Sequence, residues 1–247
     1  MNAAQRLLLL SGRSASLASR AAAIVSAAGG VLFNPSDLST MTVGRDGTGG
    51  APSSGSVVGR IYDKAGSGRY AAAPSDAARP LLTVSGGLAY ISYDGVDDRL
   101  AATFTIAQPF VRVSAFRPAQ VASGSQIIGG GTENAGVLWQ GASGNNLSIF
   151  SGSGVGIGAG SLAANTDYIA TERHNGASSR IAVGTGSYTT GNAGTTVPGG
   201  MTLGALYSGA AYFSGRIGAV AMAQADLSDA DITTLRQWVA AASGWAL

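Results

Sequence analysis

Residues 89–104 have the sequence AYISYDGVDDRLAATF, in which two short apolar runs flank an acidic segment. The runs at 89–93 and 100–104 have the length and composition of strands in a half-buried sheet. Asp94 and Gly95 between them form a tight-turn signal, because aspartate bonds to its own backbone and glycine accepts a positive φ. The stretch therefore predicts two strands joined by an acidic turn.

The same pattern continues through the chain from residue 31 onward, where short apolar runs alternate with Gly, Pro, Ser, Asn and Asp. Further runs of this kind lie at 57–62, 81–84, 110–117, 126–129, 136–139, 147–150, 167–174, 179–183, 201–206 and 215–223. Many short strands separated by turn signals are typical of an all-β sandwich or barrel, not of βαβ units. The glycines within 155–160 lack the strand-then-helix context of a dinucleotide-binding loop.

Composition excludes several classes of protein. The chain has 247 residues, of which 45% are hydrophobic and 11% are charged, so a sizeable core forms under a weakly charged surface. The formal net charge is +2 and Lys and Arg do not cluster, so we expect no binding to nucleic acid. The absence of cysteine and the presence of one histidine, His174, exclude disulfides and histidine metal clusters. No apolar run reaches the roughly 18 residues of a membrane-spanning helix, so we expect no membrane insertion.

The first 30 residues carry a helical pattern instead. Leu7, Leu10, Leu17 and Ile24 belong to an apolar stripe whose members recur every three or four residues, and Gly29-Gly30 would end the helix. We therefore divide the chain into a helical segment, 1–30, and a sandwich domain, 31–247. The apolar run at 7–10 is shorter than the roughly 7–15 residues of a secretory signal, which disfavours that interpretation.

A helix of this length is not stable alone, so its stripe must pack against something. Two alternatives stay open: packing on its own domain, and docking on another chain as an anchor for assembly. A second, C-terminal helix is predicted after Ser228, a suitable N-cap with Asp229 and Asp231 in the first turn. Its apolar positions are Ile232, Leu235, Trp238 and Val239.

Three stretches in this order carry a resemblance to a known family. They are VGRIYDKAGSG at 58–68, YDGVDDRL at 93–100, and FSGRIG at 213–218 followed by the closing helix. Together they resemble the concanavalin A-like lectin/glucanase superfamily, in the laminin-G-like form common in bacteriophage and prophage structural proteins. The resemblance implies an all-β jelly-roll sandwich of two antiparallel sheets. It also implies a setting in a tail, fibre, spike or head-decoration protein of a virion.

Because that superfamily includes enzymes, the resemblance raises the question of whether this chain is a hydrolase. Retaining relatives carry Glu-x-Asp-x-x-Glu on one strand, and neither of the two glutamates here, Glu133 and Glu172, begins such a motif. Glu172 precedes Arg173 and His174, which favours an ordinary ion pair at the end of a strand. His174 precedes Asn175-Gly176, a hairpin-turn signal that predicts an exposed histidine. We therefore predict that the protein is not an enzyme.

Two ligand sites are candidates. Asp94, Asp97 and Asp98 form the densest acidic cluster, and calcium, which relatives of this fold often bind, takes 6–8 oxygen ligands. The alternative is that Asp94 makes the turn while Asp97 or Asp98 pairs with Arg99 or another arginine. No other cofactor is expected.

The second candidate is a sugar patch at Trp139, Asn145 and Asn146, which combines an aromatic platform with amides. The alternative for Trp139 is packing in the core, since aromatic residues make up 7% of the chain.

These observations lead to a functional hypothesis with two versions. The first is a non-enzymatic structural protein of a phage or phage-like virion, assembled in the cytoplasm of the bacterial host and forming a homo-oligomer. Its helix would contact other virion proteins, and its loops would contact host surface polysaccharide. The alternative is a carbohydrate-binding module that recognises a cell-surface polysaccharide outside any virion.

Overall fold

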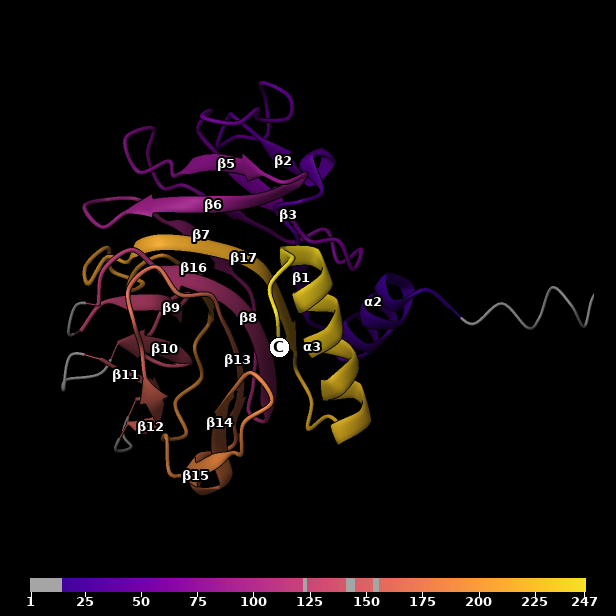
Figure 1. Cartoon of the computed structure of the whole chain (residues 1–247), viewed down its shortest axis with the longest axis vertical. Helices are drawn as coiled ribbons and strands as arrows, with labels where there is room; N and C mark the ends of the chain where they lie inside the picture. Colours follow the sequence, from indigo (N-terminus) through magenta and orange to yellow (C-terminus); the bar gives the residue numbers. More distant parts are fainter. Residues whose placement is uncertain (1–14, 122–123, 141–144, 153–155) are drawn as a thin grey trace, which may run out of the picture.

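Two antiparallel β-sheets packed face to face form the body of the protein, with helices on one side (Figure 1). The computed structural model describes residues 15–121, 124–140, 145–152 and 156–247. The architecture confirms the predicted all-β sandwich of two antiparallel sheets with one N-terminal and one C-terminal helix. Within the described ranges, no helix is long and apolar enough to cross a membrane.

The first sheet, sheet A, is built around two long strands that pair with each other, β8 (Phe110–Pro118) and β17 (Ser214–Ala223). β1 (Val31–Phe33) also pairs with β17. On one side of this pair, β8 is followed outward by β13 (Tyr168–His174), β14 (Ser179–Val183) and the edge strand β15 (Thr189–Gly191). On the other side, β17 is followed by β6 (Leu88–Asp94) and the edge strand β5 (Leu81–Ser85).

The second sheet, sheet B, has nine strands. Its order is β12 (Ile157–Ser161), β11 (Asn146–Phe150), β10 (Val137–Gln140), β9 (Gln126–Gly130), β16 (Gly200–Leu203), β7 (Leu100–Thr103), β4 (Tyr70–Ala72), β3 (Arg60–Tyr62) and β2 (Met41–Thr42). Two short 3₁₀ turns, η1 (Leu38–Thr40) and η2 (Gly176–Ser178), lie in the connections.

The residues of β8 show why the layers stack in this way. Phe110 and Phe116 face sheet B and have no exposed surface, because they belong to the cluster between the two sheets. Val113 and Ala115 point to the opposite side and belong to a second cluster. A strand that buries apolar side chains on both faces must be covered on both faces. Sheet B covers the inner face, and the helices cover the outer one.

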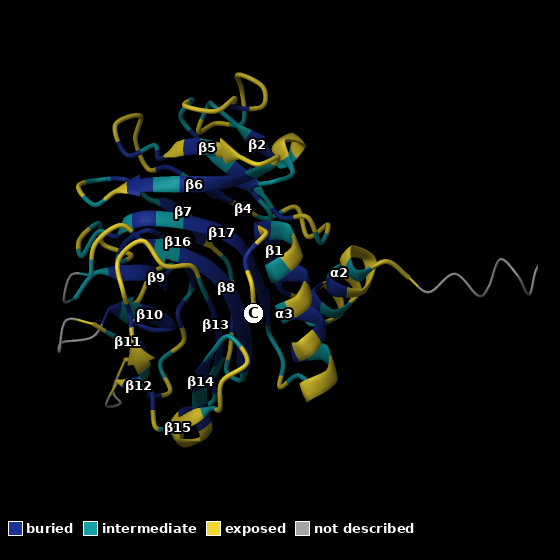
Figure 2. Ribbon diagram, in the orientation of Figure 1, coloured by how far each residue is buried: buried dark blue, intermediate teal, exposed yellow. Residues whose placement is uncertain are grey.

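The two helices that cover sheet A are α2 (Leu17–Ala27) and α3 (Asp229–Ser243). Ala21 and Val25 of α2 lie fully buried in the second cluster with Leu235 of α3 (Figure 2). The outward sides of both helices are exposed in the same view. The helices therefore act as a third layer that closes one face of the sandwich.

Local signals set the ends of α3. The Ser228 hydroxyl accepts a hydrogen bond from the Asp231 backbone N–H at 3.2 Å, as the N-cap prediction requires. Gly244 ends the helix with a φ of 68°, a conformation that glycine adopts without strain.

The predicted N-terminal stripe lies only partly within the described residues. Leu7 and Leu10 lie outside them, and α2 begins after an N-cap at Ser16. Leu17 and Ile24 are half-buried at the margin of the second cluster. The described part of the helix thus packs on its own domain, while a role in assembly stays a prediction.

Candidate functional site

A pocket of about 310 Å³ opens on sheet B, and we call it the tryptophan pocket. Its lining residues are Gln126, Asn134, Val137, Trp139, Phe150 and Gly156. Trp139 of β10 stands directly opposite Gln126 of β9, and Val137 stands opposite Phe150 of β11. Side chains that are paired in this way lie on one face of a sheet. The face is the outer one, because Leu138, the residue between Val137 and Trp139, belongs to the cluster between the sheets.

Two polar atoms of the tryptophan pocket have no partner among the residues that the structure describes. Within those residues, neither the Oε1 atom of Gln126 nor the indole Nε1 of Trp139 makes a hydrogen bond, although both atoms are buried. Gln126 is 7% exposed, and its amide nitrogen donates to Asn134 Oδ1 at 3.4 Å. Leaving a buried polar atom unpaired costs about 1–3 kcal/mol. One unpaired acceptor and one unpaired donor thus lie at the same pocket, where a ligand or water can supply the missing partners.

Glycine keeps one side of the indole open. A side chain at position 156 would place its Cβ 3.6 Å from the six-membered ring of Trp139, in contact with it. Because residue 156 is glycine, it places no side chain against this part of the ring.

The structure separates the three residues of the predicted sugar patch. Trp139 lines the tryptophan pocket, but Asn145 and Asn146 do not. Asn145 is exposed, and its carbonyl accepts a hydrogen bond from the Leu162 N–H. Asn146 is half-buried in β11. The amides near Trp139 come instead from Gln126 and Asn134, which the sequence alone did not indicate because the pairing of β9 with β10 is irregular.

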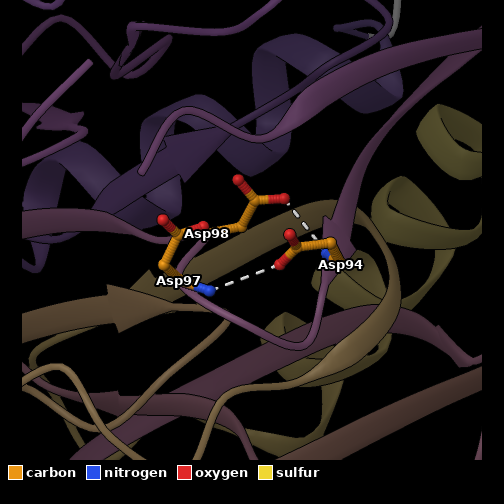
Figure 3. Close-up of side chains that lie close together, drawn as sticks. All are labelled: Asp94, Asp97 and Asp98. Atoms are coloured by element: carbon orange, nitrogen blue, oxygen red, sulfur yellow. Dashed lines mark hydrogen bonds between the residues drawn. The ribbon is translucent and has the colours of Figure 1, made fainter. Parts of the chain in front are cut away.

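The acidic residues Asp94, Asp97 and Asp98 are brought together at the turn after β6 (Figure 3). One oxygen from each carboxylate lies within 4.8 Å of the others. Asp94 Oδ1 accepts from the backbone N–H groups of Val96, at 2.8 Å, and Asp97, at 3.4 Å. Asp98 Oδ2 accepts from the Asp94 N–H at 3.0 Å.

Arg99 does not form the ion pair with Asp97 or Asp98 that the sequence offered as an alternative to a calcium site. Its guanidinium donates to the Tyr207 carbonyl instead, and no ion pair of Asp97 or Asp98 occurs within the described ranges. Burial raises the pKa of Asp98 to about 6, and the charges of Asp94 and Asp97 act in the same direction. A hard cation would relieve this repulsion, and carboxylate oxygens are ligands that calcium prefers. The three residues fit calcium as part of a ligand set that backbone carbonyls and water would complete.

A buried polar network crosses the sandwich, and it corrects two sequence predictions. Glu172 and His174 have no exposed surface, so His174 is not at an exposed hairpin tip and Glu172 is not in a strand-end pair. Arg112, opposite Glu172 on β8, donates from Nε to Glu172 Oε1 at 2.9 Å, and a second nitrogen bonds the other oxygen. His174 lies 3.3 Å from Glu172 through Nε2 and 2.8 Å from the Ser151 hydroxyl through Nδ1.

The charges of this network are fixed by its surroundings. Burial lowers the pKa of His174, which keeps the imidazole neutral. Burial alone would raise the pKa of Glu172, but the Arg112 charge and the His174 bond lower it overall. Nε2–H of His174 then donates to Glu172, and Nδ1 accepts from Ser151. The Ser151 hydroxyl has no exposed surface and also accepts from the Gly136 N–H at 3.0 Å, so it bridges the two sheets.

Comparisons with known proteins bear on the fold. No protein-family model matches the sequence, and no curated protein does. Among solved structures, a GH54 α-L-arabinofuranosidase superposes with a TM-score of 0.58 and 14% identity, over 90% of this chain and 65% of that one. Trypanosoma rangeli sialidase superposes with a TM-score of 0.52 and 14% identity, over 83% of this chain and 32% of that one. The chain thus spans about a third of the sialidase and under two thirds of the arabinofuranosidase.

These comparisons support the β-sandwich part of the family resemblance; at such identities they establish the fold alone. They also contradict the prediction that the protein is not an enzyme. Solved structures that share the sandwich are glycoside hydrolases, so the missing Glu-x-Asp-x-x-Glu pattern does not exclude an enzyme.

We predict that His174 makes stability depend on pH. Its folded pKa lies below the unfolded value of about 6.5, so the unfolded chain binds a proton first as the pH falls, and stability falls with it. Relative to His174→Gln, the wild type should lose about 1 kcal/mol of unfolding free energy between about pH 7.5 and about pH 5.5. Urea unfolding at each pH measures this difference, in which the titrations of groups that do not contact His174 cancel. A difference that is constant with pH would contradict the neutral, buried imidazole.

We also predict that calcium binds at the acidic turn. Millimolar calcium should raise the melting temperature of the wild type by about 2 °C or more relative to a chelator, because an ion that binds only the folded state stabilises it. Asp98→Asn keeps the acceptor for the Asp94 N–H but should abolish the rise. Asp76→Asn, in an exposed loop, is the matched control and should retain it. Equal melting temperatures with calcium and with the chelator would show that the cluster serves the turn alone.

Proposed function

We propose that this chain binds carbohydrate, with an uncharged sugar residue seated in the tryptophan pocket. The observation that carries the proposal is the pair of unpartnered polar atoms, Gln126 Oε1 and Trp139 Nε1, beside an indole ring that Gly156 leaves open. A ligand for this pocket must present an apolar face together with a hydrogen-bond donor and an acceptor.

A sugar ring meets each requirement of the pocket. Its C–H face packs on an aromatic ring, and the ring of Trp139 supplies that surface together with Phe150 and Val137. A hydroxyl group both donates and accepts. One hydroxyl could therefore donate to Gln126 Oε1 and another accept from Trp139 Nε1.

The composition of the pocket favours a neutral ligand. None of the described lining residues is ionisable, so a charged sugar would lose hydration without gaining a counter-charge. A volume of about 310 Å³ is at the small end for ligand pockets, which suits the end of a glycan chain. The occurrence of this sandwich in glycoside hydrolases supports a carbohydrate ligand without identifying it.

The test uses the full chain. A glycan array with calcium present selects ligands, and titration calorimetry then measures their affinity. Trp139→Ala should weaken binding at least tenfold, the loss that about 1.4 kcal/mol produces. Gln126→Met removes the unpaired acceptor and should shift preference away from glycans that offer a hydroxyl there.

Tyr70→Ala is the matched control, because Tyr70 is an exposed aromatic residue of the same sheet that does not line the pocket. Its affinity should equal that of the wild type. Binding that survives Trp139→Ala, or an array without any bound glycan, would overturn the proposal. Each bound glycan is also incubated with the protein and assayed for new reducing ends, whose release would make the pocket a substrate site.

The biological setting stays a prediction. A place in a phage virion, with virion proteins or a second copy as partners, rests on the family resemblance alone. None of the similar structures named above is a virion protein. Carbohydrate binding is compatible with attachment to host polysaccharide and with a module outside any virion.

A further inference from the structure

Two arginines stand directly opposite each other on sheet A. Arg117 of β8 pairs in register with Arg216 of β17. Both point to the outer face, because Phe116 and Ile217 beside them belong to the cluster between the sheets. Side chains that are directly opposite have Cβ atoms about 5 Å apart, so like charges in these positions repel each other. Such an arrangement is unfavourable unless something neutralises it.

Arg216 has no partner that would do so. It is the only arginine of the described ranges without a hydrogen bond, an ion pair or a stacked aromatic ring. The other arginines with such partners are Arg20, Arg45, Arg60, Arg69, Arg79, Arg99, Arg112, Arg117, Arg173, Arg180 and Arg236. Arg117 has one carboxylate partner, Asp167, at 3.5 Å on the exposed side.

Arg117 and Arg216 both line a pocket of about 180 Å³, which we call the arginine pocket. Its other lining residues are Ala119, Asn165 and Gly215, so small side chains leave space in front of the charges. Asn165 has a φ of 58°, a left-handed conformation that asparagine tolerates, and its backbone N–H donates to the Pro118 carbonyl at 2.6 Å. Its side-chain amide has no partner within the described ranges and offers a further donor.

We infer that the arginine pocket binds an oxyanion, a carboxylate or sulfate group, held between Arg117 and Arg216. Guanidinium groups bind such anions through paired, charge-assisted hydrogen bonds, which are stronger than neutral ones. A bound anion would also remove the repulsion across the strands. The pocket lies on sheet A and shares no residue with the tryptophan pocket, so the inference does not depend on the proposed function.

The test follows the arginine Nε–H signals of the full chain by NMR during titration with sodium sulfate. Sodium chloride at equal ionic strength is the reference, and sodium acetate tests a planar carboxylate. The signals of Arg117 and Arg216 should shift along one saturating curve with sulfate, with acetate, or with both, and not with chloride. The arm that saturates at the lower concentration identifies the preferred anion.

Arg216→Gln should abolish the saturating shift of the Arg117 signal. Arg45 is a surface arginine outside the arginine pocket, so Arg45→Gln should leave that shift unchanged. Arg216→Lys is the second variant if the glutamine form does not fold. It keeps the charge but loses the paired donors, so binding should weaken about tenfold or more. Shifts that grow linearly and equally with sulfate and chloride, or that persist unchanged in both Arg216 variants, would overturn the inference.

Discussion

The structure depends on a pair of strands that bury apolar side chains on both faces. β8 and β17 contribute Phe110, Phe116 and Ile217 to the space between the sheets, and Val113 and Ala221 to the side under the helices. Burial of apolar surface is the main favourable term in folding, and here it fixes three layers in a set order. α2 and α3 both lie on sheet A, and no helix of the described residues covers the outer face of sheet B. The tryptophan pocket opens on that face.

The core between the sheets also contains charge, which is costly unless it is fully paired. Arg112 and Glu172 face each other on adjacent strands, and His174 extends the network to Ser151. Because Ser151 follows β11 and bonds the backbone just before β10, the network ties sheet A to two strands that carry the tryptophan pocket. Positions of Val137 and Phe150 at the pocket thus depend on hydrogen bonds made in the core.

Local patterns predicted local structure well. The strand runs, the Asp94 turn and the Ser228 cap could all be predicted, because each depends on neighbours in sequence. Relations across strands could not. Asn175-Gly176 does mark a turn, yet His174 is buried, because β13 pairs with β8, where Phe110 stacks on the imidazole. Gln126 and Asn134 likewise join Trp139 only through the irregular pairing of β9 and β10. The absence of the Glu-x-Asp-x-x-Glu motif did not exclude an enzyme, since the same sandwich occurs in glycoside hydrolases.

Ligand binding at Trp139, on the outer face of sheet B, can be measured directly because the chain has three tryptophans. Trp238 and Trp245 are buried in the cluster under the helices, whereas Trp139 lines the pocket with an unpaired Nε1. The indole N–H signals of the full chain are recorded by NMR before and after addition of a glycan that binds. We predict a large downfield shift of the Trp139 signal, because its N–H gains an acceptor, and unchanged signals of Trp238 and Trp245. An unmoved Trp139 signal at saturation would contradict this prediction.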